Sequence, residues 1–85
     1  MNIRDLEYVV AVSEERHLGR AAVRCHISQP ALSGQIRKLE ASLGVALFER
    51  TNRIVQVTPV GEQIVAQARR LITISDEIVA TAQNA

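Results

Sequence analysis

Apolar residues recur every three to four positions along most of the chain, which is the spacing of helices that bury one face. This spacing predicts four helices, over residues 3–14, 18–25, 28–43 and 59 to about 83. Between residues 46 and 58 the period shortens, which predicts a hairpin of two short strands, 48–50 and 54–57. The predicted fold class is therefore mainly α: three helices and a two-stranded wing, followed by one long helix.

The ends of these helices carry ordinary start and stop signals. Asn2, Ser28 and Thr58 are good N-caps, and Pro30 and Pro59 fall in first turns, where a missing N–H costs nothing. Gly44 favours a left-handed stop for the third helix. The positions predicted to face the core are Ile3, Leu6, Val9, Val10, Leu18, Ala21, Ala22, Cys25, Leu32, Ile36, Leu39 and Leu43.

The last helix is longer than so small a domain needs. About 25 residues at 1.5 Å each give a rod of about 37 Å, and its apolar residues repeat by sevens with a column of small residues between them. This stripe predicts pairing with a second copy, and packing on the chain's own first helix is the alternative for part of it. The predicted dimerisation residues are Ile64, Val65, Ala68, Leu71, Ile72, Ser75, Ile78 and Val79.

Composition and charge change the picture at one point. The 85 residues carry a net charge of +1, which by itself says nothing about nucleic acid. Residues 16–53, however, hold six arginines and one lysine against two acidic residues, a net charge of +5, whereas residues 1–15 carry −3 and residues 54–85 carry −1. An arginine-rich block suits phosphate and guanine recognition, although a solvated charged face gives the same pattern.

Two short helices joined by a tight turn and followed by a basic hairpin indicate a winged helix-turn-helix, whose second helix lies in the DNA major groove. At 100° per residue, the face of that helix opposite Leu32 and Ile36 is polar, short-sided and basic. Gln29 can pair with an adenine edge and Arg37 with guanine or phosphate. The predicted DNA-binding residues are Ser28, Gln29, Pro30, Ser33, Gly34, Arg37, Lys38, Arg50, Thr51 and Arg53.

The segments HLGRAA (17–22), ISQPALS (27–33), LGVALFER (43–50) and TPVG (58–61) resemble the N-terminal DNA-binding domain of LysR-type transcriptional regulators, and similarity covers nearly the whole chain. The resemblance implies a bacterial regulator that binds promoter or operator DNA, with the helix-turn-helix at about 18–37. It implies a DNA-binding domain over 1–58 and a linker helix over 59–85 that pairs antiparallel in a homodimer. Many members carry a base-reading arginine where this chain has Gly34, so part of the usual readout is absent.

Residues 1–8 and 32–40 are in turn similar to the OxyR-like, peroxide-responsive subfamily. Full-length members add a C-terminal effector-binding domain and assemble as tetramers. We expect the present chain to be a DNA-binding fragment or a natural truncation that lacks this domain, so no small-molecule site is expected in it. The single cysteine allows no internal disulfide, which fits the cytoplasm, and neither a signal peptide nor a membrane-spanning segment is predicted.

Two rival functions remain to be weighed. An enzyme or metal site would have to use His17, Cys25 and His26, but adjacent Cys25 and His26 diverge on a helix and no further ligand has suitable spacing, so no catalytic residue, cofactor or metal is predicted. Cys25 shares a face with Leu18 and Ala22 and is predicted to be a buried structural thiol. A dimerising protein-interaction module that binds no DNA would explain the long helix but not the arginine block.

Overall fold

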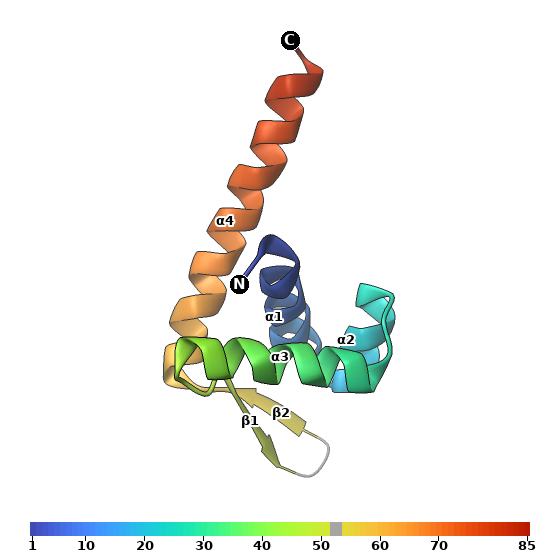
Figure 1. Cartoon of the computed structure of the whole chain (residues 1–85), viewed down its shortest axis with the longest axis vertical. Coiled ribbons are helices and arrows are strands. Elements are labelled where there is room, and N and C mark those ends of the chain that lie inside the picture. Colours follow the sequence, from blue (N-terminus) through green and yellow to red (C-terminus); the bar gives the residue numbers. More distant parts are fainter. Residues whose placement is uncertain (52–53) are drawn as a thin grey trace.

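The computed structural model describes residues 1–51 and 54–85. Three helices and a hairpin form a compact body, and a long fourth helix leaves it (Figure 1). The elements in chain order are α1 (Ile3–Glu15), α2 (Leu18–Cys25), α3 (Gln29–Leu43), β1 (Phe48–Thr51), β2 (Ile54–Val57) and α4 (Pro59–Gln83). The predicted winged helix-turn-helix with a long final helix is confirmed, with element ends within one residue of those expected. No helix among the described residues is both long and apolar enough to cross a bilayer.

Side-chain caps fix where the helices begin. Asn2 and Asp5 form a reciprocal capping box at α1, and the Ser28 hydroxyl accepts from the Ala31 N–H at 3.2 Å. Sequence reasoning missed the cap of α2: His17 Nδ1 accepts from the Arg20 N–H at 3.1 Å. Two non-glycine residues, Arg16 and His26, adopt left-handed conformations directly after α1 and α2. Arg16 makes the corner between α1 and α2, and His26 begins the turn of the helix-turn-helix.

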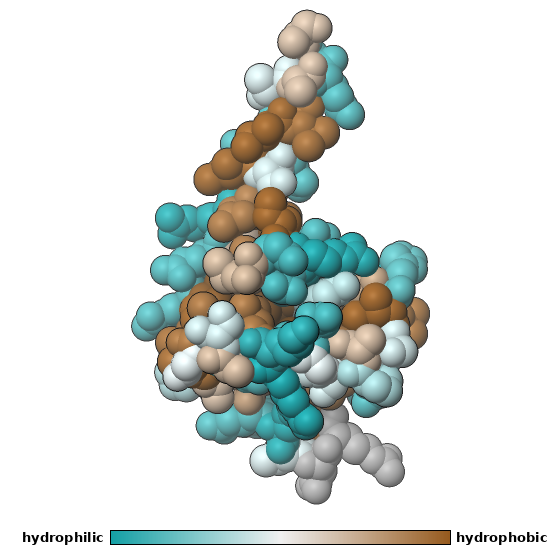
Figure 2. Space-filling view, in the orientation of Figure 1, coloured by the Kyte–Doolittle hydropathy of each residue, from teal (hydrophilic) through white to brown (hydrophobic). Residues whose placement is uncertain are grey.

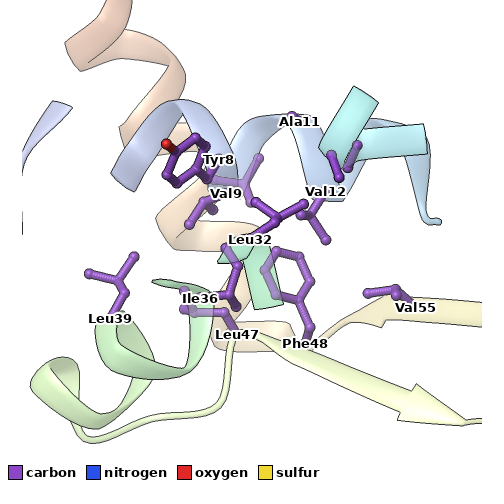
Figure 3. Packing of buried hydrophobic residues seen from close by; sticks show 13 residues of the cluster. Tyr8, Val9, Ala11, Val12, Leu32, Ile36, Leu39, Leu47, Phe48 and Val55 are labelled. Atoms are coloured by element: carbon purple, nitrogen blue, oxygen red, sulfur yellow. The ribbon is translucent and has the colours of Figure 1, made fainter. Parts of the chain in front are cut away.

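Helix α1 lies at the centre of the body. Its second half is buried nearly all round because it contacts α2, α3, α4 and β2. Figure 3 shows Leu32 and Ile36 of α3 directed toward Val9 and Val12 of α1, with Phe48 of the hairpin closing the cluster from below. The inner face of α3 is thus fixed against α1, and its opposite face is left for solvent.

Two predicted core positions are wrong. Leu43 is 39% exposed and Ile3 is 40% exposed. Both lie at an outer end of a helix, α3 in the first case and α1 in the second, where the apolar stripe has run past the neighbouring elements. Helical periodicity assigns a face but not how far along the helix that face is covered.

The hairpin is a two-stranded antiparallel ribbon in which Phe48 lies opposite Val57 and Arg50 lies opposite Val55. It is joined to the helices at both strands. The Glu40 carboxylate of α3 accepts from the N–H groups of Leu47 and Phe48 at 2.7 and 3.3 Å, and the Val55 N–H donates to the Arg16 carbonyl at 3.3 Å. Since a ribbon of two short strands is barely stable alone, these contacts set its position.

Helix α4 begins inside the body and ends outside it. Val65 and Ala68 are each 2% exposed and pack on α1, Ala68 in a small second cluster with Leu6 and Val10. The prediction that these two residues form the dimer seam is wrong, because the chain's own first helix covers them. Ile64 and Ile72 are half-buried against the same clusters. The molecule measures 49 × 25 × 19 Å because the rest of α4 projects.

Candidate nucleic-acid interface

The outward face of α3 is the best-formed candidate site. Gln29, Pro30, Gly34, Arg37 and Lys38 are exposed, as predicted, whereas the buried stripe Leu32–Ile36–Leu39 anchors the opposite side of the same helix. In the view of Figure 1 the helix crosses the front of the body, and Figure 2 shows hydrophilic side chains over this region. Because the backbone beneath is held by the core, the polar face is presented on a rigid rod.

The surface of this face is open as well as polar. A Cβ atom added at Gly34 would meet nothing within 4 Å, so no neighbour covers the backbone at that point. Ser33 is half-buried. Short side chains in the middle of the face allow close approach of a flat or grooved partner such as duplex DNA.

A hollow of about 270 Å³ lies where the starts of α2 and α3 meet the hairpin. Its lining joins His17 just before α2, Gly19 of α2, Gln29 of α3, and Arg50, Ile54 and Val55 of the hairpin. Of the predicted site residues it brings Gln29 and Arg50 to one surface. His17, Gly19 and Ile54 were missed, because their sequence positions show a cap, a small residue and a strand residue, none of which indicates an interface.

The structure divides the arginine block into two groups. Arg20 and Arg24 of α2 turn back to α1: Arg24 lies 2.7 Å from Glu14 and 3.4 Å from Glu15, and Arg20 lies 3.7 Å from Glu15. The hydrogen bond from Arg24 holds the pKa of Glu14 below its ordinary value. Within the described part of the chain, Arg37 and Lys38 form no such ion pair. Arg16, at the corner after α1, is exposed and also forms no ion pair with the described residues. The ion pairs of Arg20, Arg24 and Arg50 mean that the net charge of +5 overstates what a DNA partner would meet.

The three predicted wing residues have different fates. Thr51 is exposed at the end of β1. Arg50 points inward: its side chain is 23% exposed and its Nη2 atom lies 3.7 Å from a carboxylate oxygen of Glu40. Alternation along β1 puts Arg50 on the same face as Phe48, so the structure does not present it as the fully exposed phosphate contact that the sequence predicts. Arg53 lies outside the described residues.

The residues considered for an enzyme or metal site do not lie together in one site. Cys25 packs half-buried against the main cluster, and burial raises the pKa of its thiol, which disfavours the reactive thiolate. His17 caps a helix and His26 forms the corner after α2. Over residues 1–51 and 54–85 no group of three His, Cys, Asp or Glu side chains is arranged to hold a metal ion.

The far half of α4 carries an uncovered apolar stripe. Leu71, Ile78 and Val79 are exposed as a dimer seam requires, and Ile74, which was not predicted, joins them at 56% exposure. Ser75 lies within the stripe and is half-buried. Figure 2 shows hydrophobic residues along this projecting rod above the body.

Comparison with known proteins assigns the family. Residues 3–62 match the model of the bacterial regulatory helix-turn-helix proteins of the lysR family. The chain is 62% identical over 72 residues to the hydrogen peroxide-inducible genes activator of Pectobacterium carotovorum subsp. carotovorum, an alignment covering 85% of this chain and 24% of the relative. The chain thus spans about a quarter of the length of the curated relatives it matches.

Solved structures agree along almost the whole chain. Full-length OxyR C199D from Pseudomonas aeruginosa superposes with a TM-score of 0.94 at 49% identity, covering 99% of this chain and 28% of that one. The DNA-binding domain of CbnR, solved as a complex with DNA, superposes with a TM-score of 0.93 at 36% identity, covering 99% and 97%. The fold and the matched motifs together show that the chain belongs to the LysR family of bacterial regulatory helix-turn-helix proteins and constitutes its DNA-binding domain.

Proposed function

We propose that the chain binds specific double-stranded operator DNA by laying the outward face of α3 in the major groove. The contact residues are Ser28, Gln29, Pro30, Ser33, Gly34, Arg37 and Lys38, and the wing adds Thr51 and Arg53. The observation that carries this proposal is the exposed polar face of α3, backed by a fully buried stripe and holding two cations that no carboxylate of the described chain neutralises.

Each group has a chemical task on DNA. Gln29 stands at the first turn of α3, where its amide can make paired hydrogen bonds with an adenine edge. The unpaired N–H groups of that first turn and the positive end of the helix favour a phosphate. Arg37 and Lys38, two turns farther on, supply charge for guanine or for the backbone.

We further propose that the chain binds DNA as a homodimer. The stripe of Leu71, Ile74, Ile78 and Val79 is continuous along the free part of α4, and an equal stripe on a second copy would cover it. A dimer held through α4 would read two half-sites about one helical turn, or roughly 34 Å, apart. The related CbnR domain was solved with DNA, which supports the DNA half of this proposal.

For the whole protein we propose a peroxide-responsive transcriptional regulator that works in the cytoplasm. The support is the 62% identity to a hydrogen peroxide-inducible genes activator and the superposition on OxyR. Cys25 is a poor candidate for the sensing group, because it is a half-buried thiol whose pKa is raised by burial. A sensing role would belong to other parts of the full-length regulator.

Salt dependence tests DNA binding without knowledge of the operator. The affinity of the chain for random-sequence duplex is measured from 50 to 200 mM salt. A protein making several phosphate contacts loses affinity steeply, by about 10³-fold for six contacts. A flat response would favour the rival function, a dimerising interaction module that binds no DNA.

Selection from a random duplex library tests sequence reading. On the selected operator, Gln29→Ala should cost about 1–3 kcal/mol and relax the preference at one base pair. Gln35→Ala is the matched control, because Gln35 is an exposed glutamine of the same helix outside the proposed contact face. Equal losses on operator and random duplex would assign Gln29 to the backbone.

A further inference from the structure

One carboxylate connects the recognition helix to the wing. Glu40 lies in the last turns of α3, and its Oε2 atom accepts from the N–H groups of Leu47 and Phe48 at 2.7 and 3.3 Å. Its Oε1 atom lies 3.7 Å from Nη2 of Arg50, two residues farther along β1. The side chains of Glu40 and Arg50 are 16% and 23% exposed, so this connection is largely shielded from water.

The position of Arg50 is unusual for a guanidinium. Its Nε and Nη2 atoms are buried and find no hydrogen-bond partner within the described residues. Incomplete satisfaction of this kind costs stability, since a buried donor loses its water and gains little in return. A fully exposed arginine would be free to move, whereas this one is largely buried beside Glu40 of α3 and opposite Val55 of β2.

Stability alone does not account for this placement. An apolar residue between Phe48 and the tip would cover the core without a desolvation cost, and a buried pair is often no better than such a replacement. What the pair adds is a fixed orientation of the hairpin relative to α3. It fixes the angle between a ribbon of two four-residue strands and the helix whose outer face carries Arg37 and Lys38, two to three residues before Glu40.

We propose that Glu40 and Arg50 are a positioning pair that holds the wing at a fixed angle to α3, so that the wing and the recognition helix meet the same stretch of duplex together. The inference rests on the proposed DNA-binding function. Neither side chain touches DNA. The pair acts indirectly, because it sets how the wing that contains Arg50 is oriented relative to the exposed face of α3.

Charge provides the discriminating test. Arg50→Met removes a positive charge and Glu40→Gln removes a negative one, so simple attraction to phosphate predicts opposite changes in affinity. A positioning role predicts that both variants bind DNA more weakly. The glutamine can still accept from the Leu47 N–H, which makes Glu40→Gln the variant that keeps the strand attached if Arg50→Met fails to fold.

The experiment uses the 85-residue chain and a duplex selected from a random library by the wild-type chain. Dissociation constants and hydroxyl-radical footprints are measured for both single variants, the double variant and Arg69→Met. We expect each single variant to weaken binding about fivefold to tenfold, and the double variant to be no more than about twofold worse than either, as for partners in one interaction. Arg69→Met is the control: it also removes one charge from an ion pair, with Glu14 at 3.1 Å, but on α4.

The footprint separates positioning from a general structural role. The positioning pair requires loss of protection in the zones flanking the major-groove contact, with the central zone retained. Tighter or unchanged binding by Glu40→Gln would overturn the inference in favour of electrostatics, and proportional loss in both zones would overturn it in favour of simple destabilisation. If the wild-type chain selects no duplex at all, the proposed function itself fails.

Discussion

The two halves of α4 share one sequence pattern and have opposite environments. In the near half, Val65 and Ala68 are 2% exposed because α1 covers them. In the far half, Ile78 and Val79 are 64% and 53% exposed although they continue the same seven-residue repeat. The apolar repeat therefore predicts that α4 packs against another helix along its whole length. The length of α1 sets how much of this stripe is covered within the chain, and the rest needs a second chain to cover it.

The largest expected effect comes from a charge placed in the near half. Val65→Asp should cost about 4 kcal/mol or more of the free energy of unfolding, because an unpaired carboxylate would enter the main cluster. Urea unfolding followed by helicity, at low protein concentration, measures it. Val79→Asp makes the same change in the far half and should alter the unfolding of the monomer by less than about 0.5 kcal/mol. Similar losses for both would erase the distinction between the halves.

A second prediction addresses the far half. Ile78→Asp should raise the dimer dissociation constant by at least about 100-fold, because it sets two like charges into an apolar seam, while leaving the fold of each chain intact. Sedimentation equilibrium measures the dissociation constant. Thr73→Asp is the control, since Thr73 lies on the opposite side of α4 from the stripe. A dimer that survives Ile78→Asp would show that the stripe has another use.

A third prediction concerns the point where the near half enters the body. Gly61 lies in the first turn of α4, and an added Cβ would collide with the carbonyl oxygen of Leu47, a backbone atom that cannot swing away. Gly61→Ala should therefore destabilise the chain by about 1–3 kcal/mol. Gly34→Ala is the matched change at an open helical site and should be neutral or stabilising by up to about 1 kcal/mol. Thermal unfolding of both variants checks the sign of the difference.

The smallest effect is expected from the ion pairs around Glu14. This carboxylate lies 3.1 Å from Arg69 of α4 and 2.7 Å from Arg24 of α2, and the hydrogen bond from Arg24 lowers its pKa. A lowered pKa stabilises the fold above the ordinary value of 4.5 and loses that contribution as the pH falls through the folded value. Because the groups are well exposed, we expect less than about 1 kcal/mol.

Unfolding at pH 6 and pH 3 of the wild type and of Glu14→Gln measures this contribution. The stability gap between them should narrow at the lower pH, where the wild-type carboxyl is increasingly protonated. Glu77→Gln is the matched control, since Glu77 lies in the far half and forms no ion pair with the described residues. A constant gap for Glu14→Gln would mean that packing rather than charge joins α4 to α1 at this point.

Local signals in the sequence predicted the recognition helix α3 well. Ser28 with Pro30 predicts the start of α3, and the spacing of Leu32, Ile36 and Leu39 gives its buried face and, by rotation, its exposed one. The charge of individual arginines was less informative. Arg24 and Arg37 look alike in the sequence, yet Arg24 pairs with Glu14 of α1 whereas Arg37 pairs with no carboxylate of residues 1–51 and 54–85. Ion pairs form between elements whose arrangement a linear pattern does not contain.

The sequence by itself determined the helices, the caps of α1, α3 and α4, the hairpin and the polar face of α3, since all of these follow from contacts between residues near one another in the chain. Tertiary structure alone decided that Arg50 turns toward Glu40 of α3, that His17 lines the hollow beside Gln29, and that Val65 is core while Ile78 is exposed. The physical reason is common to all three. Burial depends on which element from a distant part of the chain packs against a residue. Periodicity predicts that a face will be covered but not how much of it is covered.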